Sequence, residues 1–305
     1  MAKRPARLQP GFVSTFPPRQ CGLATFAADL VEALDALGRF PPSRVLAVGD
    51  GRAKYLYERR VELEIPQDDP DAYLRAASRL NEGAVGAVSV QHEFGIFGGT
   101  DGCYVVPLVR ALAGPVVVTL HTVLSNPTPG QEAVIRELAR ASAALVVMAQ
   151  KGADILESRY GVPPGKVRVI PHGVPVPTHL SREQLKRKHG WNGRKILCTF
   201  GLLNPGKGLE YGLAALARVV RDHPEALYLV VGQTHPVVKR YEGEAYRYRL
   251  MNLANQLGLE YHVAFVNRYL TRDELLEYLA MTDVYVTPYT NREQICSGTL
   301  AYAVS

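Results

Sequence analysis

The segment Gly201–Gly208 has the residue types that best suit chemistry. It follows a short apolar run, Lys195–Phe200, and precedes a segment of helical period that starts at Leu209. Glycines such as Gly206 let a backbone approach a ligand closely, N–H groups at a helix start attract anions, and Lys207 adds a full positive charge. The segment therefore predicts a phosphate site. The alternative is a tight turn with a solvated lysine.

The spacing from Gly201 to Gly206-Lys207 equals the first seven positions of a nucleoside-triphosphatase P-loop. The eighth position is Gly208, where a P-loop needs a Ser or Thr hydroxyl for Mg²⁺. No apolar run ending in an acidic metal ligand is evident downstream. A diphosphate held without an essential metal fits better, so we expect neither a metal nor a bound cofactor.

A second candidate loop lies near the amino terminus, where Thr15–Phe26 reads as a strand end, a loop and a helix start. Gly22 would let this loop approach a ligand, and Arg19 is a candidate contact for an anion. A proline-stiffened turn with nothing bound explains the same residues equally well.

Polar residues also follow two predicted strands. Val90 leads into Gln91-His92-Glu93, and Leu120 leads into His121-Thr122. Polar groups at the carboxyl ends of strands in an open sheet lie in the ligand crevice. We favour a functional role for His121, and we weigh a functional and a structural role equally for His92. The second histidine of a His-Glu-x-x-His zinc motif is missing after His92-Glu93, so we expect no metal there.

A third candidate loop is 287–300, which follows one predicted strand and precedes a helix. Glu293 could accept hydrogen bonds from sugar hydroxyls, while Ser297, Gly298 and Thr299 offer N–H groups to a phosphate. The alternative is a polar loop whose Ser297 or Thr299 only caps the helix.

Short apolar runs alternate with helical segments almost throughout the chain, which predicts an α/β fold with doubly wound parallel sheets. The predicted strands are 12–15, 45–48, 61–65, 84–90, 116–120, 145–148, 167–170, 195–200, 227–231, 263–266 and 284–287. The predicted helices are 23–37, 69–80, 104–113, 131–142, 149–160, 181–189, 209–220, 244–257 and 272–281.

The proline-rich segment Pro171–Pro177 reads as an extended connection between two domains, 1–175 and 176–305. Two domains also suit a length of 305 residues. The second half holds about four strands where open sheets commonly carry five or six, and Ser305 falls inside the next helical pattern. We therefore expect the second domain to be incomplete.

The net charge of +6 and the pI of about 9.1 favour anionic ligands. Lysines and arginines are spread along the chain, and their one cluster, Lys186-Arg187-Lys188, lacks aromatic neighbours, which argues against nucleic acid. No apolar run approaches the length of a membrane span, and the start lacks the apolar part of a signal peptide. The four cysteines are far apart in the sequence. These features favour a cytoplasmic protein with reduced thiols.

Four motifs together resemble one family. Cys21–Phe26, Thr119–Thr122, Ile170–Val174 and Gly201–Gly208 look like their counterparts in retaining group 1, or family 4, glycosyltransferases. The resemblance runs over the whole chain. It implies the GT-B fold, in which two Rossmann-like domains face each other, the second holding a nucleotide sugar and the first mostly the acceptor.

The same resemblance implies roles for single residues. Lys207 would hold the donor diphosphate, His121 would lie by the donor sugar, Gly22 would face the diphosphate and Glu293 would lie near the sugar or ribose. In much of the family an arginine follows the first glycine of the phosphate loop, but this chain has Leu202. The second glutamate that usually accompanies the first near the donor site is also not reproduced after Glu293.

The expected activity is therefore transfer of a hexose, glucose or mannose, from a nucleoside-diphosphate sugar to an acceptor hydroxyl, with retention. The acceptor would be a carbohydrate or a lipid-linked molecule, and a lipid-linked one would bring the enzyme to the inner membrane face. Two alternatives stay open: a glycoside phosphorylase of the same fold, and a non-catalytic sugar- or nucleotide-binding protein.

Overall fold

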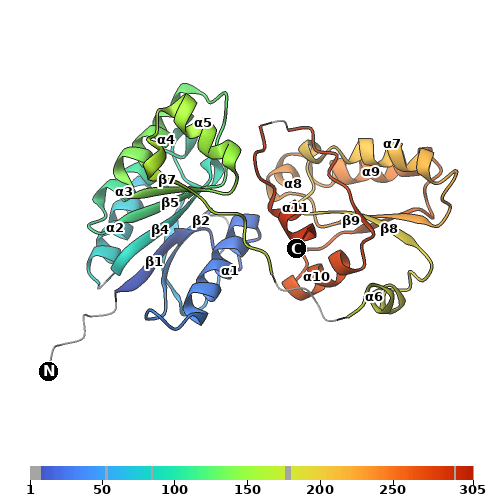
Figure 1. Cartoon of the computed structure of the whole chain (residues 1–305), viewed down its shortest axis with the longest axis horizontal. Coiled ribbons are helices and arrows are strands. Elements are labelled where there is room, and N and C mark those ends of the chain that lie inside the picture. The colour runs from blue at the N-terminus through green and yellow to red at the C-terminus, as the bar shows by residue number, and fades with distance from the viewer. Residues whose placement is uncertain (1–7, 52–53, 84, 176–179, 292, 305) are drawn as a thin grey trace. The chain divides into compact units, whose positions relative to one another are not determined.

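The computed structural model describes residues 8–51, 54–83, 85–175, 180–291 and 293–304, which form two compact units (Figure 1). The first unit ends at His172 and also includes Glu293–Cys296. The second unit begins at Gly173 and takes in the rest of the chain. The boundary predicted between positions 175 and 176 adjoins residues 176–179, which lie outside the described part of the chain.

The first unit is built on a seven-stranded parallel sheet with the strand order β3-β2-β1-β4-β5-β6-β7. Its strands are β1 (Gln9–Ser14), β2 (Arg44–Gly49), β3 (Val61–Pro66), β4 (Val85–His92), β5 (Val116–Leu120), β6 (Ala144–Val147) and β7 (Val167–Val169). Its helices are α1 (Gly22–Ala36), α2 (Pro70–Asn81), α3 (Val105–Ala111), α4 (Pro129–Ala141) and α5 (Gln150–Tyr160).

Helices cover both faces of this sheet. Successive side chains of a strand point to opposite faces, so neighbouring residues pack in different cores. Phe12 packs with Ala27 and Val31 of α1 on one face. Val13, the next residue, belongs to the larger core that α2, α3, α4 and α5 build on the other face (Figure 1). The strands β2, β5 and β6 are rich in valine and almost continuously apolar, as expected for strands of a parallel sheet buried on both sides.

The second unit has a four-stranded parallel sheet with the order β10-β9-β8-β11. Its strands are β8 (Lys195–Phe200), β9 (Ala226–Val231), β10 (Val263–Val266) and β11 (Val284–Tyr285). Its helices are α6 (Arg182–Lys188), α7 (Leu209–Val219), α8 (Pro236–Glu242), α9 (Ala245–Gln256), α10 (Arg272–Ala280) and α11 (Gly298–Ala303). Tyr228 packs toward α7 and α9, whereas Leu229 packs toward α6 and α10.

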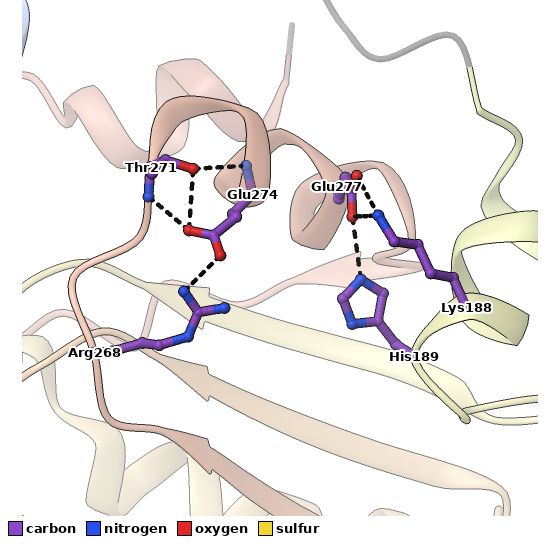
Figure 2. A network of polar contacts seen from close by, with 6 residues as sticks. All are labelled: Lys188, His189, Arg268, Thr271, Glu274 and Glu277. Atoms are coloured by element: carbon purple, nitrogen blue, oxygen red, sulfur yellow. Dashed lines mark hydrogen bonds and ion pairs between the residues drawn. The ribbon is translucent and has the colours of Figure 1, made fainter.

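Polar contacts fix the position of α10 beside α6 (Figure 2). Thr271 and Glu274 form a capping box at the start of α10, and Arg268 donates to the Glu274 carboxylate at 2.7 Å. One turn later, Glu277 accepts from Lys188 at 2.7 Å and lies 3.3 Å from His189. These contacts attach α10 to its neighbours, and their residues are not part of the sites described below.

The sequence pattern located the regular elements well, with two informative differences. The short helix α8 was not predicted, since its seven residues show less than two full periods of an amphipathic pattern. The last strand pairs only through Val284 and Tyr285, shorter than predicted. None of the described helices has the length and apolar character needed to cross a membrane.

Candidate functional site

In the first unit, β4 and β5 bring five polar residues to one edge of the sheet. The strands are parallel, with His92 opposite Leu120, so both carboxyl ends lie at the same edge. The backbone N–H of His121 donates to the backbone carbonyl of His92 at 3.0 Å. We call this group the β4–β5 edge: Gln91, His92, Glu93, His121 and Thr122.

His121 is fixed from two sides. Its Nε2 lies 2.9 Å from Gln91 Oε1, and the edge of its ring meets the ring of Phe26 on α1 with a centroid separation of 4.8 Å. Burial lowers the pKa of His121 to about 3, and the neighbouring His172 adds to this effect. The ring is therefore neutral at physiological pH, so it acts here as a hydrogen-bonding group and not as a cation.

Glu93 is the one carboxyl group of the β4–β5 edge. Its Oε2 accepts from the Thr122 hydroxyl at 2.5 Å, and its Oε1 accepts from the N–H of Phe94 at 3.0 Å. Burial raises the pKa of Glu93, while these two hydrogen bonds partly oppose that shift. Thr122 thus orients the carboxyl group, a role that the sequence pattern did not assign to it.

His92 lies beneath this edge and is completely buried. Its ring stacks on Phe97 and meets Phe94 edge-on, and neither ring nitrogen has a hydrogen-bond partner among the described residues. Burial lowers the pKa of His92 to about 3, with a smaller effect from His121. Whether His92 has a structural or a functional role stays a prediction.

The amino-terminal loop brings the start of α1 to the same unit's ligand-facing edge. Cys21 caps α1 by accepting from the N–H of Ala24 at 3.3 Å, and the Thr15 hydroxyl oxygen lies 3.1 Å from the same sulfur. Open space lies beside Gly22, where an added Cβ would meet no atom within 4 Å. Arg19 donates to the backbone carbonyl of Val48 at 2.9 Å. Its predicted contact with an anion stays a prediction.

In the second unit, the loop predicted to bind phosphate, Gly201–Gly208, runs from the end of β8 through a 3₁₀ turn at Pro205–Lys207 into α7, and we call it the phosphate loop. Gly208 has a φ of 60°, and a Cβ there would lie 2.1 Å from the carbonyl oxygen of Pro288. The N–H of Thr290 donates to the carbonyl of Gly206 at 3.1 Å. Glycine is required at this position, since the segment after β11 presses against the loop.

Lys207 is held by an aromatic neighbour from that segment. Its Nζ donates to Tyr289 Oη at 3.3 Å and lies 4.6 Å from the ring centroid. Tyr289 Oη lies 2.7 Å from Thr299 Oγ1, which in turn lies 3.0 Å from Ser297 Oγ. Burial alone would raise the pKa of Tyr289, but Lys207 and the hydrogen bonds lower it below the usual value.

The structure thus brings Lys207 of one candidate loop together with Ser297 and Thr299 of another. Gly201 lies beside them, because a Cβ on it would be 3.1 Å from Lys207 Nζ and 3.2 Å from the Thr299 methyl group. Ser297 caps α11 by accepting from the N–H of Leu300, and Gly298 is the first residue of that helix. Tyr289, which sequence reasoning missed, is the centre of this cluster.

Glu293 has a different neighbour. Its carboxylate accepts from the N–H and the hydroxyl of Ser125 at 3.0 and 2.5 Å, and these hydrogen bonds lower its pKa. Both residues belong to the first unit. The role of Glu293 near a sugar or ribose stays a prediction. Among the described residues, no group of three or more His, Cys, Asp or Glu side chains is placed to hold a metal ion.

Comparison with protein families decides the class to which this arrangement belongs. Residues 21–176 match the family described as Glycosyltransferase Family 4, and residues 181–298 match the family of group 1 glycosyl transferases. The chain belongs to glycosyltransferase family 4. It is a group 1 glycosyltransferase, an enzyme class that uses a nucleotide sugar. No curated protein sequence matches this glycosyltransferase significantly.

Solved structures identify the fold of this glycosyltransferase as GT-B. Anabaena Alr3699/HepE, solved with UDP and glucose, matches with a TM-score of 0.69 and 15% identity over 94% of this chain and 76% of that one. Sucrose-phosphate synthase from Thermosynechococcus elongatus matches at 0.68 and 16% over 92% and 75%. WaaG, a glycosyltransferase involved in lipopolysaccharide biosynthesis, matches at 0.65 and 18% over 97% and 78%.

Proposed function

We propose that this glycosyltransferase moves a hexose, glucose or mannose, from a nucleoside-diphosphate sugar to an acceptor hydroxyl with retention of configuration. The observation that carries the proposal is the cluster around Lys207, where a cation lies beside the glycine-rich start of α7. A cationic side chain and backbone N–H groups at a helix start stabilise the negative charge that develops on a leaving diphosphate.

The residues of the phosphate loop have distinct roles in this proposal. Lys207 binds the diphosphate, the N–H groups at the start of α7 bind its oxygens, and Gly206 lets the backbone approach. Ser297 and Thr299 supply further polar groups through the Tyr289 network. Leu202 occupies the position where much of the family has an arginine. Lys207 therefore supplies a larger share of the charge stabilisation than it would in a loop with two cations.

The first unit supplies neutral polar groups. His121 contacts a hydroxyl of the sugar, Gly22 leaves room beside the diphosphate, and Glu93 accepts from a hydroxyl of the bound substrates. In the reaction, the bond from the anomeric carbon to the diphosphate breaks, a bond to the acceptor oxygen forms, and the acceptor proton leaves with the diphosphate product. No metal is required by this scheme.

The choice of glucose rests on similarity of fold to proteins whose names or bound ligands include glucose or sucrose phosphate. We propose a carbohydrate or lipid-linked acceptor and a cytoplasmic location, with contact at the inner membrane face if the acceptor is lipid-linked. Nucleic acid is not an expected partner.

The test is release of nucleoside diphosphate from a panel of UDP-, GDP- and ADP-linked glucose and mannose, each with and without EDTA and with a mixture of acceptor glycans. We expect one donor to be turned over, and EDTA to leave the rate unchanged. Turnover that needs orthophosphate and an oligosaccharide instead of a nucleotide sugar would contradict the proposal, as would absence of turnover with every donor.

A further inference from the structure

Three polar side chains form a line at the β4–β5 edge. Ser89 and Gln91 are two residues apart on β4 and therefore point to the same face of the sheet. Gln91 Nε2 donates to Ser89 Oγ at 2.9 Å, and Gln91 Oε1 lies 2.9 Å from His121 Nε2. Gln91 is completely buried. Ser89 Oγ thus accepts from the amide nitrogen, and the amide oxygen of Gln91 faces His121.

This orientation decides where the imidazole of His121 carries its hydrogen. An amide oxygen can only accept, so Nε2 must be the nitrogen that bears the hydrogen. The ring is neutral and has a single N–H, so Nδ1 keeps its lone pair. The edge therefore presents a hydrogen-bond acceptor at Nδ1.

We propose that Gln91 is a positioning residue, which holds His121 as the Nε2–H tautomer so that Nδ1 accepts a hydrogen bond from a hydroxyl of the sugar substrate. The identity of that hydroxyl rests on the proposed function, but the tautomer does not. In the opposite tautomer, Nε2 and Gln91 Oε1 would be two acceptors facing each other, which is unfavourable in a buried site.

The ionisable groups around His121 do not supply another acceptor for Nε2. His172 and His92 are both imidazoles; His172 disfavours a positive charge on His121, and His121 does the same to His92. Glu93 comes from the end of β4, but its carboxyl group is engaged by Thr122 and the N–H of Phe94. Gln91 is thus the group whose chemistry selects the tautomer.

The tautomer can be read directly by nuclear magnetic resonance on the full-length chain with ¹⁵N-labelled histidine, without substrate. His121→Asn assigns the signals. We expect Nε2 to show a protonated nitrogen and Nδ1 an unprotonated one from pH 5 to pH 8. A protonated Nδ1, or an imidazolium at neutral pH, would overturn the proposal.

Two substitutions of Gln91 then separate positioning from packing. Gln91→Glu keeps an acceptor oxygen but adds a negative charge, so the Nε2–H should persist while titration of His121 moves toward neutral pH. Gln91→Leu removes the acceptor and should give a mixture of tautomers. Gln67→Leu is the control, since the Gln67 side chain donates to the backbone carbonyl of Gly95. A Gln91→Leu protein that keeps the pure Nε2–H form would contradict the proposal.

Kinetics provides the second readout. Gln91→Leu should lower kcat/KM for the donor about tenfold, the effect of about one hydrogen bond, and Gln91→Glu should recover most of it at high pH. If Gln91→Leu does not fold, Gln91→Met, which also lacks the amide acceptor but keeps an unbranched side chain, should mix the tautomers instead. If the wild-type protein turns over no donor, the proposed function fails, yet the resonance measurement still decides the role of Gln91.

Discussion

The two candidate sites differ in the charge state of their side chains. At the β4–β5 edge of the first unit, burial keeps His121 and His92 neutral and raises the pKa of Glu93. At the phosphate loop of the second unit, Lys207 is a cation held against Tyr289, whose pKa is lowered. A neutral polar surface suits uncharged sugar hydroxyls, whereas a cation beside a helix start suits a diphosphate.

This difference shows how the two halves of the fold can divide the work. Desolvation at the end of β4 and β5 penalises charge, so that edge can recognise hydroxyl groups without attracting anions in general. The phosphate loop concentrates the positive charge instead. Four single substitutions test the contrast, with progressively smaller expected effects.

Lys207→Ala should lower kcat/KM for the donor about 100-fold, because it removes the charge that, in the proposed function, faces the leaving diphosphate. The matched control is Lys195→Ala, which removes an exposed lysine from the opposite end of β8. Steady-state kinetics on both proteins measures the difference. Equal losses of kcat/KM in the two variants would show that the charge of Lys207 does not act specifically on the donor.

His92→Gln should reduce the loss of unfolding free energy that the protein shows when the pH is lowered. His92 has a pKa of about 3 in the fold and near 6.5 when unfolded, so the unfolded chain binds more protons between these values. The free energy of unfolding therefore falls as pH drops through this range, by about 2 kcal/mol per buried histidine from pH 7 to pH 5. Urea unfolding at both pH values measures it. If the wild type and the variant lose the same free energy of unfolding between pH 7 and pH 5, His92 is not held neutral by burial.

Tyr289→Phe should weaken binding of nucleoside diphosphate about threefold to tenfold. It keeps the ring under Lys207 but removes the hydroxyl that joins Lys207 to Thr299, a loss of about one hydrogen bond. Tyr289→Leu, which also removes the ring, should bind more weakly still. Calorimetric titration with the nucleotide compares the three proteins. A Phe variant as weak as the Leu variant would assign the whole effect to the hydroxyl.

Lys188→Met should have the smallest effect. Lys188 is about half exposed and pairs with Glu277 (Figure 2), and neither residue is part of a candidate site. Exposed ion pairs contribute roughly 0–1 kcal/mol, so the unfolding free energy should change little and donor kinetics should stay as in the wild type. A large loss of activity in this variant would mean that residues outside the two sites control the reaction.

Sequence patterns predicted the order of the elements and the Gly201–Gly208 loop, since both depend on local periodicity and on glycines next to a strand. They did not single out Tyr289, and they marked Gln91 only as a polar residue at a strand end, without its contact to His121. Tyr289 matters because a segment after β11 folds back onto a loop 82 positions earlier. Gln91 matters because β5 places His121 beside it, 30 positions later. Such contacts depend on strand register, which side-chain types alone do not specify.

Charged residues in loops were the hardest to assign from the sequence. Arg19 is a candidate anion contact by residue type, and the sequence did not predict its hydrogen bond to the carbonyl of Val48. Glu293 lies 168 positions from Ser125, the residue that donates to its carboxylate. Long side chains in loops reach several partners, and the sequence does not rank them.

The most direct test of the contrast between the two units is binding of a nucleoside diphosphate, without sugar, to the wild type, Lys207→Ala and His121→Asn at low and moderate salt. We predict that Lys207→Ala loses most of the affinity and its salt dependence, while His121→Asn binds like the wild type. Loss of affinity in His121→Asn with retention in Lys207→Ala would assign the diphosphate to the β4–β5 edge and contradict the account.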